Sequence, residues 1–177
     1  MTYLLLLRGV NVGAHRVPMA TLRAQLTEAG ATGVVSYINS GNLLFDDPRP
    51  DVSARVARVL ATYPFGIGFV CYPVATYLDL VATAPDWWGA PGDLRHNVLF
   101  KLPGYQAGFD ARLQAQLTPQ DRVAITPQAI FWTAPGQAHF SQSLYAKLTP
   151  QPFYPLVSIR NRNTTLKLAA LATARVN

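Results

Sequence analysis

The apolar positions in the first part of the chain form two kinds of pattern, short continuous runs and repeats at spacings of three and four. The runs are typical of buried strands, and the repeats are typical of one face of a helix. Strands are predicted at 3–8, 34–38, 43–46 and 67–72. One helical face is predicted at Met19, Leu22, Leu26 and Ala29, and a second at Val52, Val56, Val59, Leu60 and Tyr63.

The turn-forming residues agree with these elements. Pro18 suits a first helical turn, and Gly30 supplies the stop of the same helix. The Asn-Ser-Gly-Asn sequence at 39–42 joins two strands as a hairpin turn, in which Gly41 is predicted to take a positive φ. The resulting order, β-α-β-β-α-β, is that of a ferredoxin-like unit, with helices on one face of an antiparallel sheet.

The second part of the chain repeats this order of elements without repeating the sequence. Strands are predicted at 96–102, 122–125, 130–134 and 156–160, helices at 109–117 and 141–148, and a terminal helix with Asn163 as its N-cap. The sequence therefore predicts an α+β fold in which two ferredoxin-like halves, 1–73 and 96–177, pack into one compact body. A connector helix and loop at 74–95 joins the halves, and the second half ends with an extra C-terminal helix.

Length and composition limit the class of protein. Half of the 177 residues are apolar and only 14% are charged, which excludes a disordered chain and supplies a substantial core. The apolar run at 3–7 stops at Arg8 and is too short for a signal peptide or a membrane span, so a cytoplasmic protein is expected. The single cysteine, Cys71, cannot form an intrachain disulfide and is expected to be an inert core residue.

A formal charge of +6 raises the question of a nucleic-acid partner, because phosphate contacts by lysine and arginine supply most non-specific affinity. The basic residues are scattered, with no run of three, and the charge serves either general solubility or a polyanion-binding surface. His15, His96 and His139 have no partner at metal-ligand spacing, and no serine lies in a nucleophile-elbow motif. We expect no metal and no cofactor, and whether the protein is an enzyme stays open.

Three polar segments are candidate sites for an anion. The loop 8–16 leads from a strand end to a helix N-terminus, where Arg8, Asn11 and the backbone at Gly13 favour negative charge. Its spacing is neither a P-loop nor a dinucleotide fingerprint. The alternative interpretation is that its glycines permit tight turns and that Asn11 bonds its own loop.

The hairpin tip and the last strand end supply the other two segments. Ser40 and Asn42 at the tip offer more polar groups than a turn requires. Arg160, Asn161 and Asn163 lie where a strand passes into the terminal helix, and a guanidinium there suits an oxyanion or a phosphate. The alternatives are turn chemistry at the tip and helix capping at the strand end.

The same three segments, R-G-V-N-V-G, Y-I-N-S-G-N and R-N-R-N-T, resemble recurring elements of the uncharacterised bacterial family known as domain of unknown function 1697. The resemblance implies an α+β fold of two ferredoxin-like halves and no assigned activity. The chain departs from the family pattern at Ala14, at Asn39 and at Arg162, where the family has tryptophan, so the Arg162 side chain is expected at a surface. The matched positions are Arg8, Gly9, Asn11, Gly13, Tyr37, Ser40, Gly41, Asn42, Arg160, Asn161, Asn163 and Thr164.

The leading functional hypothesis is a soluble two-lobed module that binds a small anionic or phosphorylated ligand through glycine- and asparagine-rich strand ends. The expected ligand-binding residues are Arg8, Asn11, Gly13, Ser40, Asn42, Arg160, Asn161 and Asn163. The alternative is a protein that binds single-stranded nucleic acid, since ferredoxin-like sheets can present aromatic residues to unpaired bases. A third hypothesis is an enzyme whose catalytic group comes from the substrate, a metal or a second chain.

Overall fold

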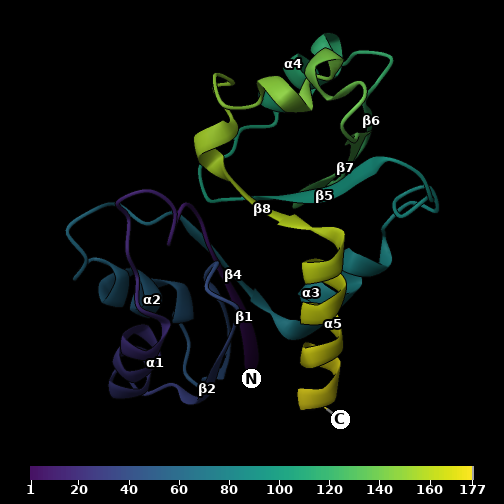
Figure 1. Cartoon of the computed structure of the whole chain (residues 1–177). Coiled ribbons are helices and arrows are strands. Elements are labelled where there is room, and N and C mark those ends of the chain that lie inside the picture. Colours follow the sequence, from purple (N-terminus) through teal and green to yellow (C-terminus); the bar gives the residue numbers. More distant parts are fainter. Residues whose placement is uncertain (177) are drawn as a thin grey trace. The chain divides into compact units, whose positions relative to one another are not determined.

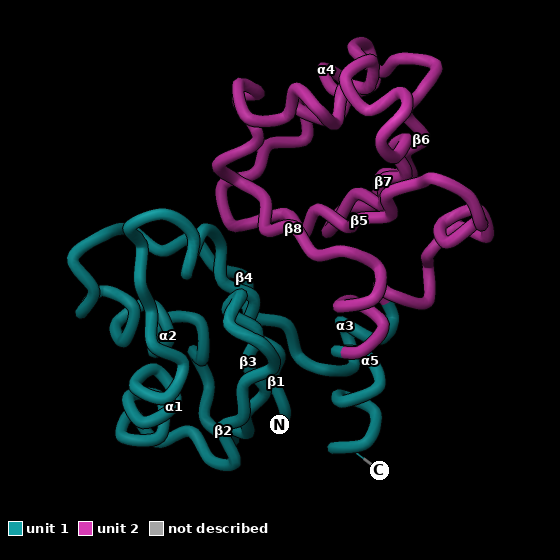
Figure 2. Tube along the Cα trace, in the orientation of Figure 1, with its two compact units in different colours: residues 1–79, 168–177 teal, residues 80–167 magenta. Residues whose placement is uncertain are grey.

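The computed structural model describes residues 1–176 and divides into two compact units. Unit 1 contains residues 1–79 and the chain from 168 onward, and unit 2 contains residues 80–167 (Figure 2). Two helices, α3 (Val74–Ala82) and α5 (Arg162–Val176), cross the boundaries between units.

Unit 1 is built on a four-stranded antiparallel sheet with the strand order β2-β3-β1-β4. Its elements in chain order are β1 (Thr2–Leu7), α1 (Met19–Glu28), β2 (Thr32–Tyr37), β3 (Asn42–Asp46), α2 (Val52–Leu60) and β4 (Phe69–Pro73). Helices α1 and α2 lie on the same side of this sheet (Figure 1). The hairpin between β2 and β3 has Gly41 at φ +77°, as predicted. Helix α1 stops just before Gly30, also as predicted, and Gly30 has φ +94°.

Unit 2 contains a second four-stranded antiparallel sheet, with the order β6-β7-β5-β8. Its elements are β5 (Leu94–Lys101), α4 (Gly108–Gln116), β6 (Arg122–Ile125), β7 (Ala129–Pro135) and β8 (Val157–Asn161), followed by the first turns of α5. Counting strands from the start of each unit, the two sheets have the same order. The α+β class is confirmed, with five α-helices among residues 1–176.

The core of unit 1 forms where the sheet meets its two helices. Leu5, Leu7, Leu43 and Phe45 of the sheet belong to one cluster with the predicted apolar faces of α1 and α2. The other face of the same strands is also buried, with Leu4 and Leu6 at 0% exposure. Burial on both faces explains why β1 is a continuous apolar run instead of an alternating one. Cys71 packs against this cluster, and burial raises the pKa of its thiol to about 12.

The predicted helix at 141–148 is wrong. The segment forms two short 3₁₀ turns, Phe140–Gln142 and Tyr145–Lys147, and a third follows at Tyr154–Leu156. Ser143 interrupts the segment with an extended backbone, donating its hydroxyl to the Phe140 carbonyl and accepting the Ala146 N–H. Asp121 accepts the N–H groups of Leu144 and Tyr145 from a distant loop. These side-chain bonds replace those of a continuous helix.

The start of the terminal helix also differs from the prediction. The Oδ1 atom of Asn161 accepts the Thr164 N–H at 2.8 Å, so Asn161 and not Asn163 is the N-cap of α5. No helix among residues 1–176 has the length and apolar character needed to cross a membrane.

Candidate functional site

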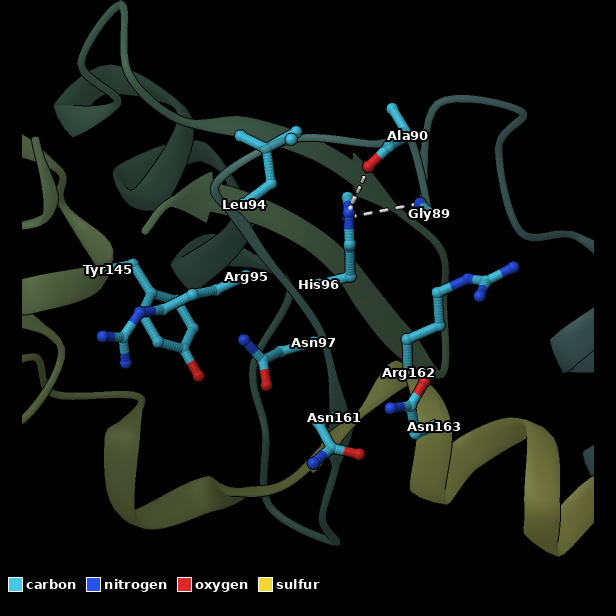
Figure 3. Close-up of a pocket in the computed structure, with 11 residues that line it drawn as sticks. Gly89, Ala90, Leu94, Arg95, His96, Asn97, Tyr145, Asn161, Arg162 and Asn163 are labelled. Atoms are coloured by element: carbon cyan, nitrogen blue, oxygen red, sulfur yellow. Dashed lines mark hydrogen bonds between the residues drawn. The ribbon is translucent and has the colours of Figure 1, made fainter. Parts of the chain in front are cut away.

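Unit 2 contains a polar cavity of about 480 Å³ where the start of β5, the end of β8 and the start of α5 meet (Figure 3). A volume of this size is within the range of small-molecule sites, roughly 300–1,000 Å³. Strand pairing brings its walls together, because Asn97 of β5 is the register partner of Asn161 of β8. The lining residues are Gly89, Ala90, Gly92, Leu94, Arg95, His96, Asn97, Tyr145, Asn161, Arg162 and Asn163.

The junction of β8 and α5 places a helix N-terminus at the cavity wall. Strand β8 ends at Asn161, and α5 begins at Arg162 without a connecting loop. The cap bond from Asn161 occupies one of the first N–H groups of the helix. The partial positive charge of the N-terminus nevertheless lies beside the cavity, where it favours a negative ligand.

Two arginines line the cavity, and each is held against an aromatic ring. The Cζ atom of Arg95 lies 4.2 Å from the ring centroid of Phe140. The Nε atom of Arg162 donates to the Trp88 carbonyl at 3.1 Å, and its Cζ atom lies 5.6 Å from the ring of that residue. Both guanidinium groups are therefore positioned before any ligand arrives.

Gly89 makes room for one of these arginines. It has φ +125°, and a Cβ atom at this position would collide with the Arg162 guanidinium. Any residue other than glycine at position 89 would therefore suffer both backbone strain and this steric overlap. Arg162, expected at a surface, is thus partly buried on Trp88 and is a wall of the cavity.

His96 of β5 forms hydrogen bonds to the loop that contains Gly89 and Ala90. Its Nδ1 atom accepts the Gly89 N–H at 3.2 Å and lies 2.8 Å from the Thr133 hydroxyl, while Nε2 lies 3.0 Å from the Ala90 carbonyl. A carbonyl can only accept, so this geometry assigns the proton to Nε2. Both ring nitrogens are occupied by protein groups, which makes His96 a positioning residue for the loop.

Tyr145 supplies a neutral hydrogen-bonding group. Burial, with a smaller contribution from Tyr154, raises the pKa of its phenol to about 12, and Arg95 acts in the opposite direction. The hydroxyl therefore carries its proton at neutral pH and can donate to an anion. None of the described residues that line the cavity is an aspartate or a glutamate, so its charged side chains are all cationic.

The residues predicted from the third segment divide between the cavity and the sheet. Asn161 and Asn163 line the cavity, and Arg160 does not. Arg160 is 7% exposed, and its Nη1 atom donates to the Ser158 hydroxyl at 3.1 Å and to the Ile159 carbonyl at 2.8 Å. Its guanidinium is thus bonded within the protein.

The other two predicted segments lie together in unit 1. The Nδ2 atom of Asn11 donates to the Val17 and Asn39 carbonyls, and its Oδ1 atom accepts the Val17 N–H. Asn42 is fully buried and donates to the Tyr37 carbonyl and the Ser40 hydroxyl. These amides organise the loop and the hairpin tip, in line with the alternative interpretation of both segments.

The backbone of the loop 8–16 is bonded to a neighbouring strand at its start and is exposed at Gly13. The Arg8 N–H donates to the Gly68 carbonyl, which attaches the end of β1 to the start of β4. Gly13 has φ +56° and no atom within 4 Å of an added Cβ, so the loop is open to solvent at that point.

Sequence reasoning missed Arg95, Asn97 and Tyr145. One signal in the sequence could have indicated the first two of these residues. It is the polar run Arg-His-Asn at the start of a strand that is otherwise apolar. Tyr145 has no such signal, because its place depends on the irregular segment between β7 and β8.

The comparisons with known proteins agree with this architecture. The chain matches the family described as "Protein of unknown function (DUF1697)" over residues 1–131. It belongs to that family. It is similar to a solved structure, the conserved bacterial protein SP0830 from Streptococcus pneumoniae, with 30% sequence identity and a TM-score of 0.89. That similarity covers 97% of this chain and 98% of the other. No curated protein matches the chain with significant similarity.

Proposed function

We infer that the DUF1697 chain binds a small anionic or phosphorylated ligand in the cavity of unit 2. The observation that carries this inference is the charge of the lining: Arg95, Arg162 and the N-terminus of α5 surround a space that has no carboxylate among its described walls. Charged and bidentate hydrogen bonds from arginine to an oxyanion are about twice as strong as neutral ones. The lining therefore selects for negative charge.

Three amides provide the directional part of recognition. The side chains of Asn97, Asn161 and Asn163 follow one another between Arg95 and Arg162 in the view of the cavity (Figure 3). An amide can donate to an anion and accept from a ligand hydroxyl, so this row suits a ligand that carries both groups. A phosphorylated polyol or a hydroxy acid has that chemistry.

The shared strand order supports describing each unit as a ferredoxin-like half, with 3₁₀ turns in place of the second helix of unit 2. The free thiol of Cys71 fits a reducing compartment such as the cytoplasm, where small phosphorylated metabolites are found.

Single-stranded nucleic acid has less support as the ligand. Stacking of bases on a sheet requires exposed aromatic side chains. Among residues 1–176, every phenylalanine, tyrosine and tryptophan is buried or partly buried, and the exposed large apolar residues are aliphatic.

A thermal-shift titration with inorganic phosphate, pyrophosphate and a panel of phosphorylated metabolites tests the proposal. A ligand at 100 times its Kd stabilises the protein by roughly 2.7 kcal/mol. Arg95→Ala should abolish the shift, and Arg112→Ala, at an exposed position on α4, should keep it. The absence of any shift, or equal shifts in both variants, would contradict the proposal. A shift caused only by oligonucleotides would favour the nucleic-acid alternative.

A further inference from the structure

A second hollow of about 630 Å³ lies in unit 1, outside the three segments that the sequence identified as candidate sites. It is formed by α1 and α2, which pack side by side (Figure 1), together with the turn before α2. Its lining includes three arginines, Arg49, Arg55 and Arg58, and the apolar residues Ala29 and Val59. This hollow is independent of the unit 2 cavity, since the two share no residue.

Two of the three arginines are fixed by one buried carboxylate. Asp47, with a side chain only 3% exposed, accepts from Nε and Nη2 of Arg49 at 2.9 Å each and from Nε of Arg55 at 3.1 Å. The hydrogen bonds of Arg49, followed by those of Arg55, hold the pKa of Asp47 well below its usual range. One carboxylate between two guanidinium groups leaves one positive charge in excess at this wall.

Arg49 is fixed and still accessible. Its Nη2 atom also donates to the Ala29 carbonyl at 2.8 Å, and its guanidinium lies against Gly30, where an added Cβ would be 2.6 Å from Nη1. The Arg49 side chain keeps 43% of its surface exposed. A charge that is held in place before binding loses little conformational freedom when a ligand arrives.

The remaining charged residues around the hollow determine the sign of its net charge. Arg58 lies one turn after Arg55 on α2 and is exposed, and Glu28 at the end of α1 is the carboxylate on the rim. Arg49, Arg55 and Arg58 against Asp47 and Glu28 leave a net charge of +1. A lining that combines positive charge with apolar surface suits an ion that has an anionic head and an apolar body.

We propose that the hollow between α1 and α2 binds an organic anion with one negatively charged head group and an apolar body. The head group contacts Arg49 and Arg58, and the body lies on Ala29 and Val59. Glu28 weakens this binding by repulsion. The site operates whether or not the unit 2 cavity binds its own ligand.

A ¹H–¹⁵N NMR titration with 1-naphthyl phosphate tests the proposal, because it locates binding residue by residue. The amide signals of Ala29, Arg58 and Thr62 should shift together and saturate. Inorganic phosphate and 1-naphthalenemethanol, which supply the head and the body alone, should bind at least several-fold more weakly. Shifts confined to the unit 2 cavity, or no saturable shift around the hollow, would overturn the proposal and leave the unit 2 site untouched.

Charge variants provide the matched controls. Arg58→Glu should weaken binding in the hollow roughly fivefold, the equivalent of about 1 kcal/mol, and Glu28→Gln should strengthen it roughly two- to fivefold. Arg112→Glu makes the same charge change at an exposed position in unit 2 and should leave the affinity unchanged. Equal affinities in Arg58→Glu and Arg112→Glu would overturn the assignment, as would equal binding of inorganic phosphate and 1-naphthyl phosphate.

Discussion

The side-chain amide of Asn11 donates a 2.6 Å hydrogen bond to the backbone carbonyl of Asn39 and so joins the first loop to the hairpin tip of unit 1. The same amide closes its own loop through two bonds to the backbone of Val17. Asn11 also has φ +57°, a left-handed conformation that asparagine tolerates better than most residues. One residue therefore connects two of the three segments that characterise the sequence.

Replacing Asn11 should destabilise unit 1 in two separable ways. Asn11→Ala should lower the free energy of unfolding by about 2 kcal/mol, because it removes three hydrogen bonds and places alanine at positive φ. Asn11→Gly should cost less, because glycine removes the bonds but accepts the backbone angle. Urea denaturation measures both, and equal losses in the two variants would show that the backbone angle contributes nothing.

The cap of α5 can be tested with two asparagines that both line the cavity. Asn161→Ala should cost about 1 kcal/mol, because the Thr164 N–H loses its acceptor. Asn163→Ala should change stability by less than about 0.5 kcal/mol, as surface substitutions usually do. Chemical denaturation of the two variants decides between the caps, and a larger loss for Asn163→Ala would restore Asn163 as the cap.

Gly89 and Arg162 should behave as a coupled pair. Gly89→Ala should destabilise by roughly 1–3 kcal/mol, since alanine meets φ +125° and overlaps the guanidinium. In the Arg162→Ala background the same change should cost at least about 0.5 kcal/mol less, because the overlap is gone. A double-mutant cycle by thermal denaturation measures the difference. Strict additivity would mean that Gly89 is needed for its backbone angle alone.

Arg160 is expected to act in stability more than in binding. Arg160→Ala should lower the free energy of unfolding by about 2–3 kcal/mol, because it leaves the Ser158 hydroxyl and the Ile159 carbonyl without this donor in a buried place. Arg95→Ala, on the exposed start of β5, should cost less than about 0.5 kcal/mol. If Arg160→Ala keeps full stability and loses the ligand-induced thermal shift, Arg160 returns to the list of binding residues.

The buried Asp47 should make unit 1 sensitive to acid. Its pKa is lower in the folded state than in the unfolded chain, so its contribution to stability is complete above the ordinary value of roughly 3.9. That contribution is lost progressively as the pH falls below this value toward the folded-state pKa. Asp47→Asn should flatten the acid limb of a stability profile measured by urea denaturation between pH 7 and pH 2. Asp51→Asn, at an exposed aspartate without a capping bond, should leave it unchanged.

The helices of the two units differ in how well the local sequence pattern predicted them. The apolar faces of α1 and α2 were predictable, because a period of three to four residues is enough to define a helix that buries one side. The segment at 141–148 has a similar pattern and forms 3₁₀ turns instead, because Asp121 takes up its backbone N–H groups from outside the segment. A prediction from neighbouring residues cannot include an acceptor that the fold delivers from elsewhere.

The sequence by itself determined the α+β class, the order of the strands and of every helix except the wrongly predicted one at 141–148, and the turns at Gly30 and Gly41. Each of these depends on residues within a few positions of one another. Only the tertiary structure decided which polar groups share a cavity. The pairing of β5 with β8 brings Asn97 to Asn161, and the irregular segment after β7 adds Tyr145. It also decided that Arg160 of β8 bonds to Ser158 and Ile159, while Asn161 at the strand end and Arg162 at the start of α5 line the cavity. Successive residues of a strand point to opposite faces, and only the packing shows which face is open.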